Sequence, residues 1–178
     1  IYFDNFNFNN YNENVEGTTD RIKIRVRWYG DLFAPIKKPK LEIKIKKGLL
    51  GTKKIIKLED FNLNDNLSDI FKPLEDSYIY KRYDLNTVSP VLLNSYSRSY
   101  YISNNKSYRI TIDDNQSYYK IFKCNNSFLH KVNDDNSKVL EIKYNDMSDD
   151  NVNHITNSFP FRMTKNSKYV NGIQSIYS

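Results

Sequence analysis

Cysteine, glycine and proline are all scarce in this sequence. Its 178 residues include one cysteine, Cys124, with 5 glycines and 5 prolines. A single cysteine excludes an intrachain disulfide framework and a cysteine-based zinc site, so we expect a reducing compartment, the cytoplasm. The sequence also lacks the roughly 18 consecutive apolar residues of a membrane span. Its first residues, IYFDNFNFNN, lack the basic start and apolar run of a signal peptide.

The overall composition is that of a basic, folded protein. Lys and Arg outnumber Asp and Glu by 27 to 21, which gives a net charge of +6 and favours an anionic partner. Hydrophobic residues make up 39% and aromatic residues 15% of the chain, too much for a disordered protein. This length is enough to bury one core, so we predict a single domain over residues 1–178.

Apolar and polar residues alternate along most segments, which is typical of half-buried strands. In the clearest case, over 21–29, Lys23, Arg25 and Arg27 fall on one face and apolar residues on the other. We predict a mainly β (α+β) protein. Further strands are predicted over 41–47, 53–58, 78–83, 91–102, 108–113, 118–123 and 139–144, with short helical segments over 60–74 and helices over 148–158 and 168–177.

The charged strand faces allow two interpretations. A charged face is usually solvated, as in an open sheet whose other face packs on helices. The alternative is a closed antiparallel barrel with a charged lumen, and we favour it because five strands share the pattern. Arg98, Arg109 and Lys53 or Lys54 add to these faces.

Phosphate is the anion that these faces suit best. Arg25 and Arg27 share a face about 6.6 Å apart, so their guanidinium groups repel unless an anion lies between them. Scattered carboxylates, Glu42, Asp113 and Glu141, would balance the lumen and offer hard oxygen ligands to Mg or Mn.

Other chemistries are poorly supported. His130 and His154 lie in Asn/Asp-rich segments without a partner at metal-ligand spacing, and Cys124 has only Lys123 as a nearby cation in the sequence. Neither GxxxxGK[ST] nor GxGxxG occurs. Acidic residues interrupt the basic strands, so no nucleic-acid partner is expected.

Seven segments occur in the order and spacing of one family: RIKIRVRWYG, LEIKIK, TKK, SYSR, YRITID, VLEIKY and KNSKYVNG. Together they resemble the VTC domain, the polyphosphate polymerase domain of the triphosphate tunnel metalloenzymes, which are more distantly related to the CYTH proteins. The resemblance covers nearly the whole chain and implies an antiparallel eight-stranded β-barrel tunnel flanked by short helices. Family members have a further strand before the YFD segment, so the chain is expected to lack its N-terminal segment.

The resemblance also implies a set of site residues, carried over motif by motif. The expected catalytic residues, which would contact phosphates, are Arg25, Arg27, Lys44, Arg98 and Arg109. The expected substrate-binding residues are Lys23, Lys53, Lys54, Tyr96, Lys143, Lys165 and Lys168. Glu141 matches the family's metal ligand, for Mn or Mg.

The function implied by the resemblance is a metal-dependent phosphotransferase. It would transfer the γ-phosphate of ATP, or of another nucleoside triphosphate, to a growing polyphosphate chain inside the basic tunnel. An inorganic triphosphatase of the same fold and a non-catalytic polyphosphate-binding module are the alternatives. The presence of Glu141 favours an enzyme over a binding module.

Overall fold

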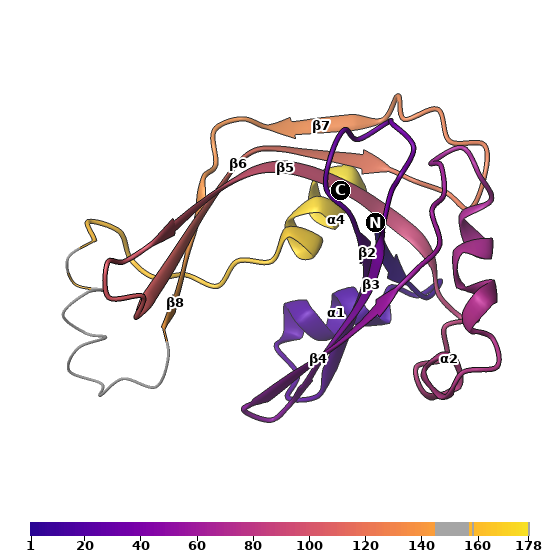
Figure 1. The fold of residues 1–178 in the computed structure, drawn as a ribbon, viewed down its shortest axis with the longest axis horizontal. Helices are drawn as coiled ribbons and strands as arrows, with labels where there is room; N and C mark the ends of the chain where they lie inside the picture. Colours follow the sequence, from indigo (N-terminus) through magenta and orange to yellow (C-terminus); the bar gives the residue numbers. More distant parts are fainter. Residues whose placement is uncertain (145–156, 158, 178) are drawn as a thin grey trace. The chain divides into compact units, whose positions relative to one another are not determined.

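The computed structural model describes residues 1–144, 157 and 159–177, and most of the helix predicted over 148–158 lies outside them. Strands dominate the element order (Figure 1). The elements are β1 (Tyr2–Asp4), α1 (Asn9–Glu16), β2 (Arg21–Arg27), β3 (Lys40–Lys47), β4 (Leu50–Lys57), the 3-10 helix η1 (Leu67–Leu74), α2 (Tyr78–Arg82), β5 (Ser89–Ile102), β6 (Tyr108–Lys120), β7 (Lys131–Asp134), β8 (Val139–Tyr144) and α4 (Lys168–Tyr177).

The eight strands belong to one sheet. Their order is β4-β3-β2-β1-β5-β6-β7, and β8 pairs with β6. The pairs β1–β2, β1–β5, β2–β3, β3–β4 and β6–β8 are antiparallel. The predicted mainly β class is therefore confirmed. In the part of the chain that the structure describes, no pairing joins β4 to β7, so closure into a barrel is not confirmed.

The chain divides into two compact units. The first comprises Ile1–Asn94, Tyr118–Val132 and Lys168–Ser178, and the second comprises Ser95–Ser117 and Asn133–Ser167. Strands β5 and β6 each contribute one part to each unit. Among the described residues, no helix combines the length and apolar character needed to cross a membrane.

The core of the first unit lies on both faces of its strands. On one face, the apolar residues of β2 and β3 pack with residues of η1 and α2, including buried Leu67 and Phe71. On the other, α4 packs Tyr169 and Ile173 with Leu92 and other residues. A Cβ on Gly172 of α4 would clash with the side chains of Leu92 and Tyr118, so glycine is what allows this close packing.

Several predicted elements need correction. The segment Tyr78–Tyr83, predicted as a strand, forms α2, and the Ser77 hydroxyl caps it by accepting a hydrogen bond from Tyr80 N–H. The strands predicted over 108–113 and 118–123 are one strand, β6, in which Asn115 has a φ of 50°. The left-handed residue changes the alternation, which is why the pattern looked like two strands.

Helix α1 and strand β7 were not predicted. Phe8 precedes α1 without a side-chain cap, so the usual start signal is missing. The cap comes instead from Asp4, whose carboxylate accepts hydrogen bonds from Asn10 N–H and Tyr11 N–H. Strand β7 falls in an Asn/Asp-rich segment, and Asn and Asp are depleted in strands.

Candidate functional site

A buried carboxylate lies at the centre of the charged face of the first unit. Glu42 on β3 is 0% exposed, and Arg25 lies opposite it on β2. Arg25 donates from Nε and from one terminal nitrogen to Glu42 Oε2, at 2.9 and 2.6 Å. Arg27 Nε lies 3.0 Å and Lys53 Nζ 3.6 Å from Glu42 Oε1. We call these four residues the Glu42 cluster.

The Glu42 cluster is held in its charged form. Burial alone would raise the pKa of Glu42, but Arg25, Arg27 and Lys53 outweigh it and lower that pKa. Burial also acts against the charge of Arg25, whereas Tyr2 and Glu42 raise its pKa. Three cations therefore share one carboxylate, and the cluster keeps a net positive charge.

Arg27 contacts Tyr29 in addition to Glu42. One of its terminal nitrogens donates to the Tyr29 hydroxyl at 2.8 Å, and its guanidinium lies 5.2 Å from the centre of the Tyr29 ring. Tyr29 was not among the predicted site residues. A signal existed, because Tyr29 stands two positions after Arg27 and an extended chain repeats every second residue.

Three lysines lie side by side on adjacent strands, and one of them, Lys53, also belongs to the Glu42 cluster. Lys23 on β2 faces Lys44 on β3, which in turn faces Lys53 on β4. We call them the lysine row. Burial, with Lys44, Arg21 and Arg25 nearby, lowers the pKa of Lys23 to about 8. Like charges directly opposite one another destabilise a sheet, so this face favours a bound anion.

The two lysines of the TKK segment lie on opposite faces. Lys53 belongs to the charged face through its register with Lys44, whereas Lys54 is opposite Ile43, on the apolar face. Lys54 therefore does not share the charged face, and its contact with substrate stays a prediction. Period-two alternation allowed either lysine, and the register of β3 with β4 selects Lys53.

The second unit holds an arginine in a bidentate ion pair. Arg98 on β5 donates from Nε and a terminal nitrogen to the two carboxylate oxygens of Asp113 on β6, the second at 2.7 Å. This pairing raises the pKa of Arg98, together with Tyr96 and Tyr100, and outweighs the effect of burial. The Arg98 guanidinium lies 5.2 Å from the centre of the Tyr96 ring and 6.0 Å from that of Tyr100.

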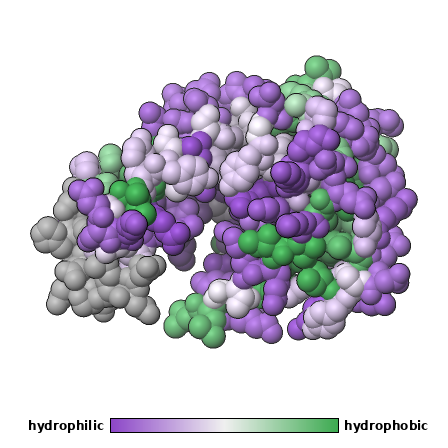
Figure 2. All heavy atoms as spheres, viewed as in Figure 1, coloured by the Kyte–Doolittle hydropathy of each residue, from purple (hydrophilic) through white to green (hydrophobic). Residues whose placement is uncertain are grey.

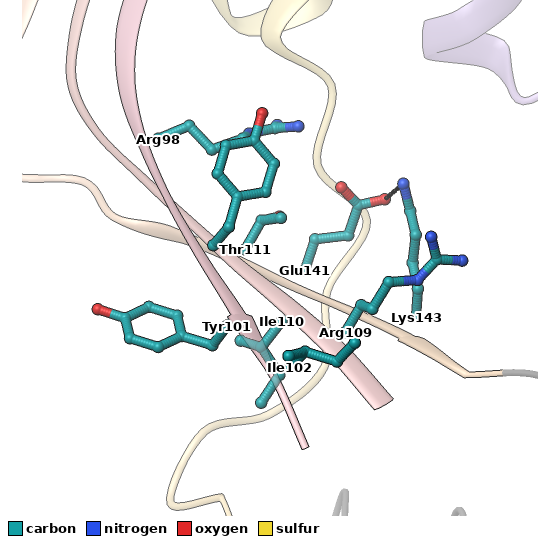
Figure 3. A pocket seen from close by; sticks show the side chains of 9 residues that line it. Arg98, Tyr101, Ile102, Arg109, Ile110, Thr111, Glu141 and Lys143 are labelled. Carbon is teal, nitrogen blue, oxygen red and sulfur yellow. Dashed lines mark ion pairs between the residues drawn. The ribbon is translucent and has the colours of Figure 1, made fainter. Parts of the chain in front are cut away.

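A hollow of about 280 Å³ lies beside this pair, and we call it the Arg98 hollow. Its lining residues are Arg98, Tyr100, Tyr101, Ile102, Arg109, Ile110, Thr111, Glu141 and Lys143. Figure 3 shows Arg109, Glu141 and Lys143 gathered together, while Tyr101 points away from them. The register places Arg109 opposite Lys143 and Thr111 opposite Glu141. Thr111 Oγ1 is buried and makes no hydrogen bond among the described residues.

Glu141 is the carboxylate that could hold a divalent ion here. Its side chain is 45% exposed, and its Oε1 lies 3.3 Å from Lys143 Nζ. Within the described ranges, no three His, Cys, Asp or Glu side chains form a metal-binding group. One carboxylate still fits Mg²⁺ or Mn²⁺ where substrate phosphates supply the other ligands, as is common for Mg²⁺.

The predicted site residues thus form two sets, one in each unit. The first unit brings together Arg25, Arg27, Lys23, Lys44 and Lys53, and the second brings together Arg98, Tyr96, Arg109, Lys143 and Glu141. Lys165 is exposed in a segment between β8 and α4, and Lys168 is the first residue of α4. Their contact with substrate stays a prediction.

Two comparisons with known proteins bear on the chain. The family model described as the VTC domain matches residues 1–177. A comparison with curated proteins finds no match.

Proposed function

The chain belongs to the VTC domain family, and we propose that it is a metal-dependent polyphosphate polymerase. In this proposal, it transfers the γ-phosphate of ATP, or of another nucleoside triphosphate, to the end of a polyphosphate chain. Family membership is consistent with a polyphosphate-related function and supports phosphotransfer. The observation that carries the proposal is the density of cations in the Glu42 cluster and the lysine row, where two arginines and three lysines surround one carboxylate and so favour an anionic substrate.

The first unit would position the phosphates. Phosphoryl transfer needs little covalent help from the protein, so catalysis depends on positioning and on stabilising the charge of the equatorial oxygens. Glu42 fixes the guanidinium of Arg25, and Glu42 and Tyr29 fix that of Arg27, before substrate arrives. Donors held in place beforehand cost no reorganisation when the charge develops.

The second unit would contribute Arg109, Lys143 and Glu141. Arg109 and Lys143 lie opposite each other and add positive charge beside the Arg98 hollow. A divalent ion held by Glu141 would supply, when bound, neutralisation of the phosphate charge. Arg98, like Arg25, uses Nε and one terminal nitrogen on a carboxylate, so only its other terminal nitrogen would contact phosphate. Closure of the sheet into an eight-stranded tunnel remains part of the proposal.

One assay separates this function from its alternatives. The protein is incubated with ATP and Mn²⁺, and the products are resolved into long-chain polyphosphate and free phosphate. Long chains support the polymerase. Free phosphate from inorganic triphosphate without long chains would replace it with a triphosphatase, and binding of polyphosphate without any turnover would replace it with a binding module.

A matched pair of variants ties the activity to the charged face. Lys53→Ala should lower kcat/KM by about tenfold, the effect of one lost charge-assisted hydrogen bond. Lys54→Ala removes the neighbouring lysine from the opposite face and should leave kcat/KM unchanged. Equal losses in the two variants would contradict the assignment of the phosphate site to this face.

A further inference from the structure

The hairpin formed by β3 and β4 ends in two exposed leucines. Leu49 is 98% and Leu50 is 77% exposed. Figure 2 shows an apolar tip projecting at the end of this hairpin, bordered by hydrophilic surface. Two adjacent, highly exposed leucines are unusual on a surface that contacts only solvent. Exposed apolar groups of this kind often mark an interaction site.

The turn that carries these leucines is firmly held. Lys47 is opposite Leu50, so the connection is a two-residue turn of Gly48 and Leu49. Gly48 has a φ of 57°, as the first residue of such a turn requires. Its N–H lies 3.1 Å from Thr19 O and 3.3 Å from Asp20 Oδ1. These hydrogen bonds hold the backbone at Gly48, directly before the leucine pair.

Lysines surround the tip on both faces of the hairpin. Lys46 and Lys53 point to the charged face, and Lys47 and Lys54 to the opposite one, as the register shows. All four lie within four residues of the leucine pair. A flat acidic protein surface would contact one face of the hairpin. A lipid surface surrounds an inserted tip, so it would meet the lysines of both faces.

We propose that the β3–β4 tip binds the surface of an anionic lipid bilayer. Leu49 and Leu50 enter the boundary between headgroups and acyl chains, and Lys46, Lys47 and Lys54 contact the anionic headgroups around them, whereas Lys53 is directed to Glu42. Burial of the leucines provides insertion, and the lysines provide the preference for anionic lipid. The inference does not depend on the proposed polyphosphate synthesis.

Vesicle binding tests the proposal directly. The protein is floated with vesicles of phosphatidylcholine alone and with vesicles that also contain phosphatidylserine, and we expect binding to the second only. Leu49→Ser with Leu50→Ser should lower the partition coefficient by roughly tenfold or more. Leu129→Ser, at an 87% exposed leucine elsewhere in the first unit, is the matched control and should not change it.

The lysines are tested without touching the Glu42 cluster. Lys47→Ala and Lys54→Ala lie on the opposite face, and each should weaken binding to the anionic vesicles by roughly fivefold. Insertion has its own readout. In Leu49→Trp, brominated acyl chains should quench the added indole fluorescence. The single natural tryptophan, Trp28, packs against the core and supplies the background measured in the unaltered protein.

Three results would overturn the proposal. One is absence of binding to the anionic vesicles, and another is binding that the paired serine variant retains in full. The third is self-association of the chain through the tip. In that case the paired serine variant would change the sedimentation coefficient and leave vesicle binding unchanged. The thermal midpoint of each variant verifies the fold, and quenching in Leu49→Trp gives an independent result if a serine variant is unstable.

Discussion

Two glutamates in the two units show how burial decides the use of a carboxylate. Glu42 in the first unit is fully buried and contacts three cations, whereas the Glu141 side chain in the second unit is 45% exposed and lies beside Lys143. The two looked equivalent in sequence, since each stands two positions before a lysine on a strand. Glu42 is a buried counter-ion of two arginines and a lysine, whereas Glu141 pairs with one exposed lysine.

The same contrast extends to the arginines. Arg25 and Arg27 share one carboxylate between them, so their combined charge exceeds that of their partner. Arg98 has a carboxylate of its own, because Asp113 pairs with it through both oxygens. In the proposed function, the first unit would therefore be the stronger phosphate site of the two, and the second would depend on Arg109 and Lys143 for its positive charge.

The largest expected effect comes from removing the charge of Glu42. In Glu42→Gln, Arg25, Arg27 and Lys53 lose their counter-ion, and the free energy of unfolding should fall by about 3–5 kcal/mol, as for other buried ion pairs that lose one partner. Glu141→Gln is the control, at an exposed position, and should change it by less than about 0.5 kcal/mol. Denaturant titration of both variants measures the difference.

Tripolyphosphate adds a second measurement to this comparison. An anion can replace the missing carboxylate charge, so the ligand should raise the thermal midpoint of Glu42→Gln more than that of the unaltered protein. Equal stability of the two glutamine variants would show that Glu42 is not the counter-ion that orders the cluster.

A somewhat smaller effect is expected for Arg27→Ala, and it falls on catalysis. The variant should lose roughly 3 kcal/mol of transition-state stabilisation, or about a hundredfold in kcat, as for one preorganised donor. Its stability should change little, because repulsion with Arg25 is relieved while the contact with Glu42 is lost. Polyphosphate synthesis and thermal unfolding are measured side by side. Unchanged turnover together with a large drop in the thermal midpoint would assign Arg27 a structural role only.

Much of the first unit could be predicted because its strands alternate without interruption. Strand β2 places Ile24 and Val26 in the core and Arg25 and Arg27 on the charged face, as the period of two requires. The predicted bounds of β8 and α4 are also confirmed. The family was recognised from motifs in order, and the family model confirms it.

The errors arise where contacts distant in sequence decide the local structure. Helix α1 starts without its own cap because Asp4 supplies the acceptors. Asp4 also accepts a hydrogen bond from the Tyr169 hydroxyl of α4, 165 positions away. Burial and Asp4 raise the pKa of Tyr169, which keeps this donor protonated. No local pattern around Asp4 indicates either role.

Glu42 shows the same limit at the site. Sequence alternation placed it on the charged face and suggested a balancing or metal-binding role. Its complete burial depends on side chains from β2 and β4 as well as from β3. The register of the three strands brings these side chains together. A pattern within one strand cannot distinguish such a carboxylate from an exposed one such as Glu141.

Glu141→Gln tests whether the carboxylate of the second unit holds a divalent ion. The amide keeps the shape of the side chain and removes the charge that attracts a divalent ion, so turnover at limiting Mn²⁺ should fall by about tenfold or more. Polyphosphate binding without metal should persist, because Arg109 and Lys143 remain. A Mn²⁺ series, with labelled polyphosphate titrated in parallel, measures both. Equal turnover at every Mn²⁺ concentration would remove Glu141 from the site.

The smallest expected effect is a pH dependence confined to the first unit. The pKa of Lys23 is lowered from 10.5 to about 8, by burial first and then by Lys44, Arg21 and Arg25. The empty folded protein therefore loses this proton as the pH rises through 8, while the unfolded chain keeps it up to about 10.5. Charged Lys23 therefore lowers the free energy of unfolding below pH 8. This free energy increases as the pH rises from about 8 to 10.5.

Ligand binding should raise the pKa of Lys23 again, because a phosphate beside it favours the charged form. Tripolyphosphate should thus bind with uptake of a proton near pH 8, and its affinity should fall as the pH rises further. Calorimetric titration in two buffers of different ionisation enthalpy gives the number of protons taken up. Lys23→Gln should lower that number, whereas Lys47→Gln, on the other face of the hairpin, should not. The phosphate's own titration is the same for the unaltered protein and both variants, so it cancels in the comparison. Equal proton uptake by all three proteins would mean that the lysine row does not contact the ligand.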